Sequence, residues 1–128
     1  MQLHILAHQH IRLKTAGDGL EVIGESFGPL EMLATSLALC TASVVSTYAE
    51  TAHLDLTGLE VEVRWEYVDQ PYRVGAYTMT LHLPATVPEA RRRPIMRAAE
   101  TCTVHNTLVH PPRITTEVRS LEGQPVTG

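Results

Sequence analysis

The sequence predicts a single α+β domain over residues 1–128, in which an antiparallel sheet packs against two long helices, the first of them central. Three observations support this prediction. Two segments alternate apolar and polar residues as half-buried strands do, a stretch of more than twenty residues contains no helix breaker, and a second helical pattern follows a predicted hairpin. The expected order is β-β-α-β-β-α-β. A chain of 128 residues can bury a core without disulfides or metals.

The N-terminal segment is expected to form one strand over residues 3–13, because apolar side chains alternate there with polar ones. A turn at residues 16–19 then leads to a short returning strand at Leu20–Ile23.

Three histidines, His4, His8 and His10, are expected on one face of the first strand. No carboxylate or cysteine stands beside them at ligand spacing, and a zinc site normally takes three or four ligands. The sequence therefore predicts a solvated face and no metal site.

The longest helix is expected from Leu30 to Ala52. Gly28-Pro29 is typical of a helix start, since proline suits the first helical position. Charge appears only near the ends of this segment, at Glu31 and Glu50, so the helix is apolar nearly all round. Such a helix is buried on several sides, and in a domain this short we expect a partner subunit to cover one of them.

A hairpin is expected next, with strands at Leu59–Tyr67 and Arg73–Leu83 joined by a turn at Asp69-Gln70-Pro71. Both strands alternate apolar and polar residues. Their short connection indicates antiparallel pairing.

The second helix is expected from about Pro88, and its apolar residues at i, i+3, i+4 and i+7 end at Cys102. Pro94 lies within this segment and should kink the helix or mark its true start. A last strand is expected at Arg113–Leu121, after the break at Pro111-Pro112.

Charge and termini exclude several classes of protein. The net charge of −4, from 14 acidic and 10 basic side chains, argues against binding to nucleic acid or to an anionic membrane. The N-terminus has neither the basic region nor the cleavage site of a signal peptide, and no uninterrupted apolar run reaches the roughly 20 residues of a membrane span. We therefore expect a cytoplasmic protein without a cofactor. Its two cysteines are then expected to be free or redox-active.

The candidate reactive residues are Cys40 and Cys102. Taken alone, each is more simply explained as core packing, since a free cysteine behaves as a small buried hydrophobe. Both, however, lie in aliphatic segments of low charge that would accept a hydroperoxide with an apolar tail. A thiol peroxidase needs a thiolate, polar contacts near its sulfur and a second thiol that condenses with the sulfenic acid.

Two stretches of the chain resemble the motifs of the OsmC/Ohr family. Residues 28–42 hold a proline, a glutamate and a helix of small residues that reaches Cys40. In residues 98–108, Cys102 ends a helix ahead of an Asn-Thr-Leu turn. Residues 58–63 match as well. The two cysteine motifs occur in the family's order, 62 residues apart.

This resemblance implies an intertwined homodimer with two active sites at the subunit interface. It implies that Cys40 is the peroxidatic thiol, that Cys102 is the resolving thiol, and that Glu31 organises the site together with an arginine. The expected reaction is the reduction of organic hydroperoxides, with electrons from a dithiol or a lipoylated protein. Arg12 is the only arginine ahead of Glu31.

Several alternatives remain open at this point. Arg12 is explained equally well as a solvent-facing strand residue. Glu31 is also explained by the helix dipole, which favours acidic residues in the first turn of any helix. His105 either lowers the pKa of Cys102 or hydrogen-bonds the turn. At the level of function, the alternatives are a non-catalytic dimer that binds an apolar small molecule and a thiol redox sensor.

Helix geometry predicts where Glu31 acts. Nine residues separate it from Cys40, which places the two side chains on opposite faces of a regular helix with about 13 Å of rise between them. We therefore expect the carboxylate near each Cys40 to come from the partner subunit.

Overall fold

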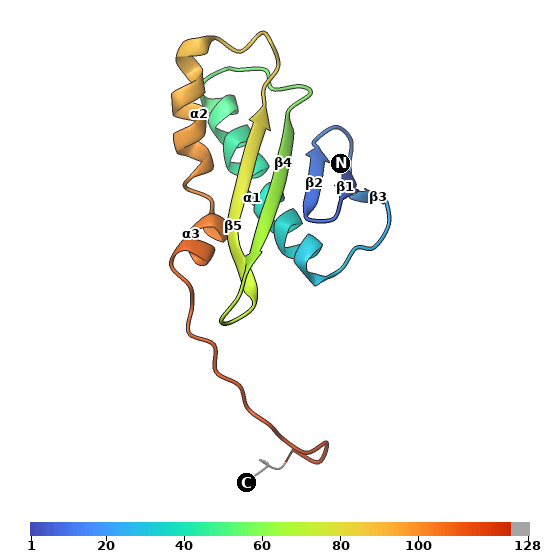
Figure 1. Ribbon diagram of the computed structural model, residues 1–128. Coiled ribbons are helices and arrows are strands. Elements are labelled where there is room, and N and C mark those ends of the chain that lie inside the picture. The colour runs from blue at the N-terminus through green and yellow to red at the C-terminus, as the bar shows by residue number, and fades with distance from the viewer. Residues whose placement is uncertain (124–128) are drawn as a thin grey trace.

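Five strands form one sheet in the computed structural model, which describes residues 1–123, and helices cover one face of this sheet (Figure 1). The strand order across the sheet is β3-β1-β2-β4-β5. The strands are β1 (Gln2–Ala7), β2 (His10–Lys14), β3 (Glu21–Ile23), β4 (Glu60–Val68) and β5 (Arg73–His82). The predicted α+β class is confirmed, and so is the hairpin of β4 and β5, whose antiparallel pairing extends over both strands.

The N-terminal segment differs from the expected single strand, because the chain reverses at His8 and Gln9 and forms the antiparallel pair of β1 and β2. Gln9 adopts a left-handed conformation, with φ of 67°, that allows this tight turn. The short loop preserves the alternation, since Leu3 pairs with Leu13 and Ile5 with Ile11. The alternation of apolar residues continues in phase through the turn, so it did not reveal the hairpin of β1 and β2.

The sheet is mixed rather than purely antiparallel. The short strand β3 forms as expected after the turn, but it pairs with β1 in parallel, with Leu3 opposite Val22. The expectation of a purely antiparallel sheet was therefore wrong at this one edge.

The long helix α1 (Pro29–Thr51) confirms the predicted helix to within one residue at each end. Gly28 caps it in an extended conformation. Its buried face consists mainly of small residues, which let it pack closely against β2 and β4. These buried residues are Ala34, Thr35, Leu37, Ala38, Thr41, Ala42, Val45 and Ala49. By length and hydropathy α1 would also suit a membrane span, a test that core helices of soluble proteins pass as well.

The second helical segment is broken, contrary to the expectation of one long helix. A 3₁₀ turn, η1 (Glu89–Arg91), leads into α2 (Arg92–Ala99), and a separate helix α3 (Thr103–Val109) follows. Cys102 lies between the two helices with extended backbone angles, φ of −59° and ψ of 135°. Pro94 falls in the first turn of α2, where a proline is tolerated. Cys102 is thus a helix cap and not part of the apolar face of α2.

The core lies between α1 and the inner face of the sheet, and α2 closes one side of it. Its fully buried large side chains come from five elements and one loop. They include Leu3, Ile11, Leu13, Val45, Leu59, Val61, Val63 and Ile95.

The C-terminal segment forms no strand of the sheet within the described residues, so the expected strand at Arg113–Leu121 is not found. The segment extends away from the body of the molecule (Figure 1). Its apolar side chains are open to solvent: Ile114 is 84% exposed and Val118 62% exposed.

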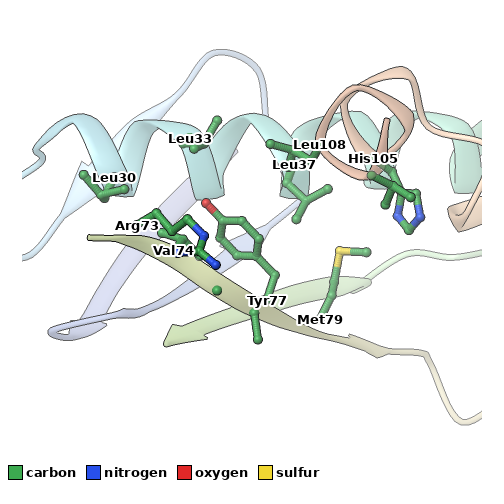
Figure 2. A pocket seen from close by; sticks show the side chains of 12 residues that line it. Leu30, Leu33, Leu37, Arg73, Val74, Tyr77, Met79, His105 and Leu108 are labelled. Atoms are coloured by element: carbon green, nitrogen blue, oxygen red, sulfur yellow. The ribbon is translucent and has the colours of Figure 1, made fainter. Parts of the chain in front are cut away.

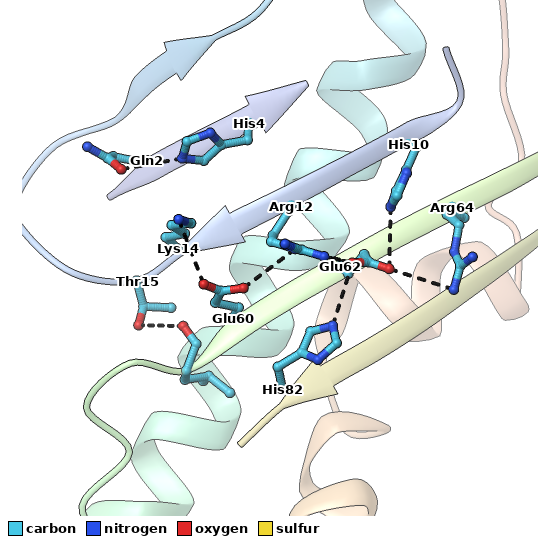
Figure 3. Close-up of polar contacts among 11 residues, drawn as sticks. Gln2, His4, His10, Arg12, Lys14, Thr15, Glu60, Glu62, Arg64 and His82 are labelled. Carbon is cyan, nitrogen blue, oxygen red and sulfur yellow. Dashed lines mark hydrogen bonds and ion pairs between the residues drawn. The ribbon is translucent and has the colours of Figure 1, made fainter. Parts of the chain in front are cut away.

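A charged cluster centred on Glu62 occupies the outer face of the sheet (Figure 3). Glu62 is 6% exposed, and its carboxylate pairs with the Arg12 guanidinium. His10, Arg64 and His82 approach it at 3.3, 3.6 and 3.5 Å. The hydrogen bond from Arg12 is the main reason that the pKa of Glu62 falls to about 2, although burial opposes the shift.

This cluster predicts a loss of stability in acid. The pKa of folded Glu62 lies below its ordinary value of 4.5, so its contribution is complete above that value and is lost as the pH falls toward about 2. Glu62→Gln should lower the free energy of unfolding at neutral pH by about 2 kcal/mol and flatten its dependence on pH over this window. Urea unfolding followed by circular dichroism measures both effects. Glu66→Gln, an exposed position on the same strand, is the control. An acid slope unchanged by Glu62→Gln would contradict the prediction.

Candidate active site

The two cysteines lie next to each other, although 62 residues separate them in the chain. Cys40 sits in the middle of α1 and is partly exposed, whereas Cys102 at the start of α3 is fully buried. Both are free thiols, and their side chains are hydrogen-bonded to each other. The fold therefore brings the sequence-predicted pair together.

The first turn of α3 supplies polar contacts to both sulfurs. The backbone N–H of His105 donates a hydrogen bond to the Cys102 sulfur at 3.4 Å, so Cys102 caps the helix. The N–H groups of Thr103 and Val104 donate to the Cys40 sulfur. First-turn N–H groups have no partner within their own helix, which leaves them available to a thiolate.

These contacts separate the pKa values of the two thiols. Burial alone would raise the pKa of Cys40, but hydrogen bonds from Cys102 and from the backbone of Val104 and Thr103 outweigh burial and lower it. For Cys102, burial raises the pKa, and its hydrogen bond with Cys40 raises it further. Cys40 is therefore the thiol that loses its proton first.

Figure 2 shows an apolar cleft of about 620 Å³. It runs between α1, β5 and α3. Leu37, one helical turn before Cys40, and His105, three residues after Cys102, line one part of it. Arg73, Tyr77 and His105 are the polar side chains of a wall that is otherwise formed by Leu30, Leu33, Leu37, Val74, Gly75, Ala76, Met79, Leu108 and Val109.

Glu31 is not brought to the thiol of its own chain. The helix α1 is continuous from Pro29, so Glu31 and Cys40 point to opposite sides with about 13 Å of rise between them. Glu31 lines a different hollow, beside Ile5 and Gly24. Within one chain, Glu31 and Cys40 therefore lie on opposite faces of a regular helix, as expected from the sequence.

Arg12 is engaged on the outer face of the sheet. It pairs with Glu62 and, at 3.5 Å, with Glu60 (Figure 3). Its neighbours in β2, Ile11 and Leu13, point the other way into the core beneath α1. Within residues 1–123, no arginine is among the groups that set the pKa of Cys40. Arg12 is thus a solvent-facing strand residue, which is the alternative interpretation that the sequence allowed.

The N-terminal histidines do not form the shared row that was expected. His8 lies in the turn, while His4 on β1 contacts Gln2 and His10 on β2 contacts Glu62. In the described part of the chain, no three His, Cys, Asp or Glu side chains are placed to hold a metal ion.

Comparisons with known proteins agree on one family. The family model for OsmC-like protein matches residues 17–117. A crystal structure from Psychrobacter arcticus 273-4, named for osmotic stress induction and a detoxification response, is 27% identical with a TM-score of 0.61; the match covers 66% of this chain and 61% of that one. An OsmC-like hydroperoxide resistance protein from Jannaschia sp. CCS1 has the same fold at 18% identity and a TM-score of 0.63, over 94% of this chain and 92% of that one. No curated protein sequence matches the chain.

The hydrogen bond between the thiols predicts how Cys40 titrates. Cys102→Ala removes a donor from the Cys40 sulfur and should raise the pKa of Cys40, whereas Cys102→Ser keeps a donor and a helix cap and should shift it less. The rate of alkylation of Cys40 by iodoacetamide, followed by mass spectrometry across pH, reports this value. The wild-type midpoint should lie below 9.0. Identical midpoints in all three proteins would show that Cys102 does not act on Cys40.

Proposed function

The chain belongs to the OsmC-like protein family, and from this premise we propose that it is a thiol-dependent peroxidase that reduces organic hydroperoxides through Cys40 and Cys102. The observation that carries the proposal is the placement of the Cys40 sulfur, which receives hydrogen bonds from Cys102 and from two backbone N–H groups of α3. A thiolate held in this way is a nucleophile next to a second thiol, and Leu37, one helical turn before Cys40, lines an apolar cleft.

The proposed reaction has three steps. The Cys40 thiolate attacks the outer oxygen of the hydroperoxide, the O–O bond breaks, and the alkoxide leaves as an alcohol after taking a proton, with Cys40 as sulfenic acid. The Cys102 thiol then attacks the Cys40 sulfur, which forms a disulfide and releases water. Finally, a dithiol or a lipoylated protein reduces the disulfide by thiol exchange. A reducing compartment such as the cytoplasm would maintain that reductant.

The proposed working form is an intertwined homodimer with its active sites at the subunit interface. Two surfaces support this form. The exposed face of α1 carries Met32, a large apolar residue that is 52% exposed. The C-terminal segment alternates β-branched residues at 114, 116 and 118 with polar or charged ones, a strand pattern that joins no sheet within residues 1–123. A second copy of the chain would cover the exposed face of α1. An edge strand of its sheet would pair with the C-terminal segment.

Glu31 is proposed to act across this interface. Within one chain it lies on the far side of α1 from Cys40, so a carboxylate near the thiol has to come from elsewhere. The partner's copy of α1 is the source we propose.

A redox sensor is the second candidate function. The observation that favours it is that Arg12, the arginine expected to complete the site, is engaged by Glu62. A thiolate without a nearby cation can still oxidise to a disulfide but would turn over slowly. A non-catalytic dimer that binds an apolar molecule would leave both thiols inert.

A peroxide assay separates these functions. Wild type should consume cumene hydroperoxide with dithiothreitol as reductant, and Cys40→Ser should lose at least about 10³-fold in rate, because it removes the nucleophile. Cys102→Ser should turn over more slowly and accumulate overoxidised Cys40, which mass spectrometry detects. Thiol loss without turnover in wild type would favour the sensor. Thiols that do not react with the peroxide would favour the non-catalytic dimer that binds an apolar molecule.

Mixing two inactive variants tests the interface. Glu31→Gln and Cys40→Ser should each abolish turnover as homodimers, while the heterodimer regains one intact site made of Cys40 from one chain and Glu31 from the other. Light scattering should first give about twice the chain mass of 14.1 kDa. Verified heterodimers without recovered activity would rule out the shared site, and a monomer at micromolar concentration would rule out the interface altogether.

A further inference from the structure

The hydroxyl group of Tyr77 is an unexplained feature of the apolar cleft. Its oxygen is shielded from solvent and has no hydrogen-bond partner within residues 1–123. Burial raises the pKa of Tyr77, so the hydroxyl keeps its proton and remains a donor. A buried hydroxyl without a partner costs free energy, and such a group usually has a reason to be there.

Arg73 lies at the same end of the cleft (Figure 2). One of its guanidinium nitrogens donates to the backbone carbonyls of Asp69 and Pro71, at 3.3 and 2.9 Å. In the described chain, no carboxylate pairs with it. A cation and an unsatisfied donor therefore lie together at the end of the cleft away from His105 (Figure 2).

The rest of the cleft runs from this end toward Leu37 and His105, the lining residues closest in sequence to Cys40 and Cys102 (Figure 2). Leu30, Leu33 and Leu37 follow one another along α1, and Cys40 comes one turn later. The ten residues from Leu30 to Cys40 correspond to about 15 Å of helix. An aliphatic chain lying against these leucines would therefore join the charged end to the reactive sulfur.

We propose that the cleft binds an amphipathic carboxylate, whose carboxylate group contacts Arg73 and Tyr77 and whose aliphatic chain runs along the leucines toward Cys40. Charge complementarity selects this occupant, because the cleft offers one guanidinium and one hydroxyl donor and no acidic side chain. Arg73 is exposed, and a change of its rotamer would admit the carboxylate to both groups. Only the identity of the ligand as a hydroperoxide substrate rests on the proposed function; the binding itself does not.

Binding of a saturated twelve-carbon carboxylate and of its methyl ester, below micelle-forming concentrations, tests the proposal. The single tryptophan, Trp65, reports binding by fluorescence, because its ring centre lies 6.3 Å from that of Tyr77. Arg73→Met should weaken binding of the carboxylate about tenfold and leave the ester unchanged. Arg93→Met, an exposed position on α2 outside the cleft, is the matched control and should change neither.

Tyr77→Phe provides an independent test. It should weaken binding of the carboxylate a few-fold without lowering the stability of the free protein to chemical denaturation, because the hydroxyl has no partner to lose. Loss of stability on this substitution would assign the hydroxyl a structural role and overturn its part in the proposal.

The outcomes separate this inference from the peroxidase proposal. Equal affinity for carboxylate and ester, or no effect of Arg73→Met, overturns the carboxylate site even if hydroperoxides are reduced. Absence of saturable binding by either ligand also overturns it. Carboxylate binding that depends on Arg73, in a protein that does not turn over hydroperoxides, would support this inference and reject the peroxidase.

Discussion

The break in the backbone at Cys102 is the feature on which the rest of the site depends. If α2 continued through this position, the N–H groups of Thr103 and Val104 would bond to carbonyls one turn earlier in the same helix. Because Cys102 is extended and caps α3 instead, those groups begin a new helix and are available to the Cys40 sulfur. One change of direction in the chain therefore creates both the cap and the thiolate contacts.

The small residues of α1 make this arrangement possible. Alanines and threonines on its buried face let the sheet and the C-terminal helices approach closely, and α1 contacts both α2 and α3. Cys40 lies on this helix at the level of the α3 start. Larger side chains at Ala38 or Thr41, both fully buried, would separate α1 from its neighbours and open the gap between the sulfurs.

The sequence predicted α1, the hairpin of β4 and β5 and the proximity of the two cysteines, because each rests on a long periodic pattern or on two motifs in order. Of the features that the sequence did not predict, three have definable reasons. The turn at Gln9 keeps the alternation of Leu3 and Leu13 in phase, so periodicity alone could not reveal it. Cys102 fits the apolar spacing of α2 as well as it fits a cap, and the cap bond comes from a backbone N–H, which every non-proline residue has, so the sequence could not reveal it. Arg73 and Tyr77 enter the cleft from β5 through the tertiary fold, which no local pattern encodes.

Burial and hydrogen bonding together assign an order to the two thiols. The same hydrogen bond lowers the pKa of Cys40 and raises that of Cys102, so the two sulfurs are not equivalent nucleophiles at neutral pH. Cys102 is fully buried and cannot meet a large substrate, whereas Cys40 is partly exposed near the cleft. Under the proposed mechanism Cys40 must therefore react first. Its oxidation removes the negative charge that held up the pKa of Cys102, which makes the buried thiol easier to deprotonate at the moment when it has to attack.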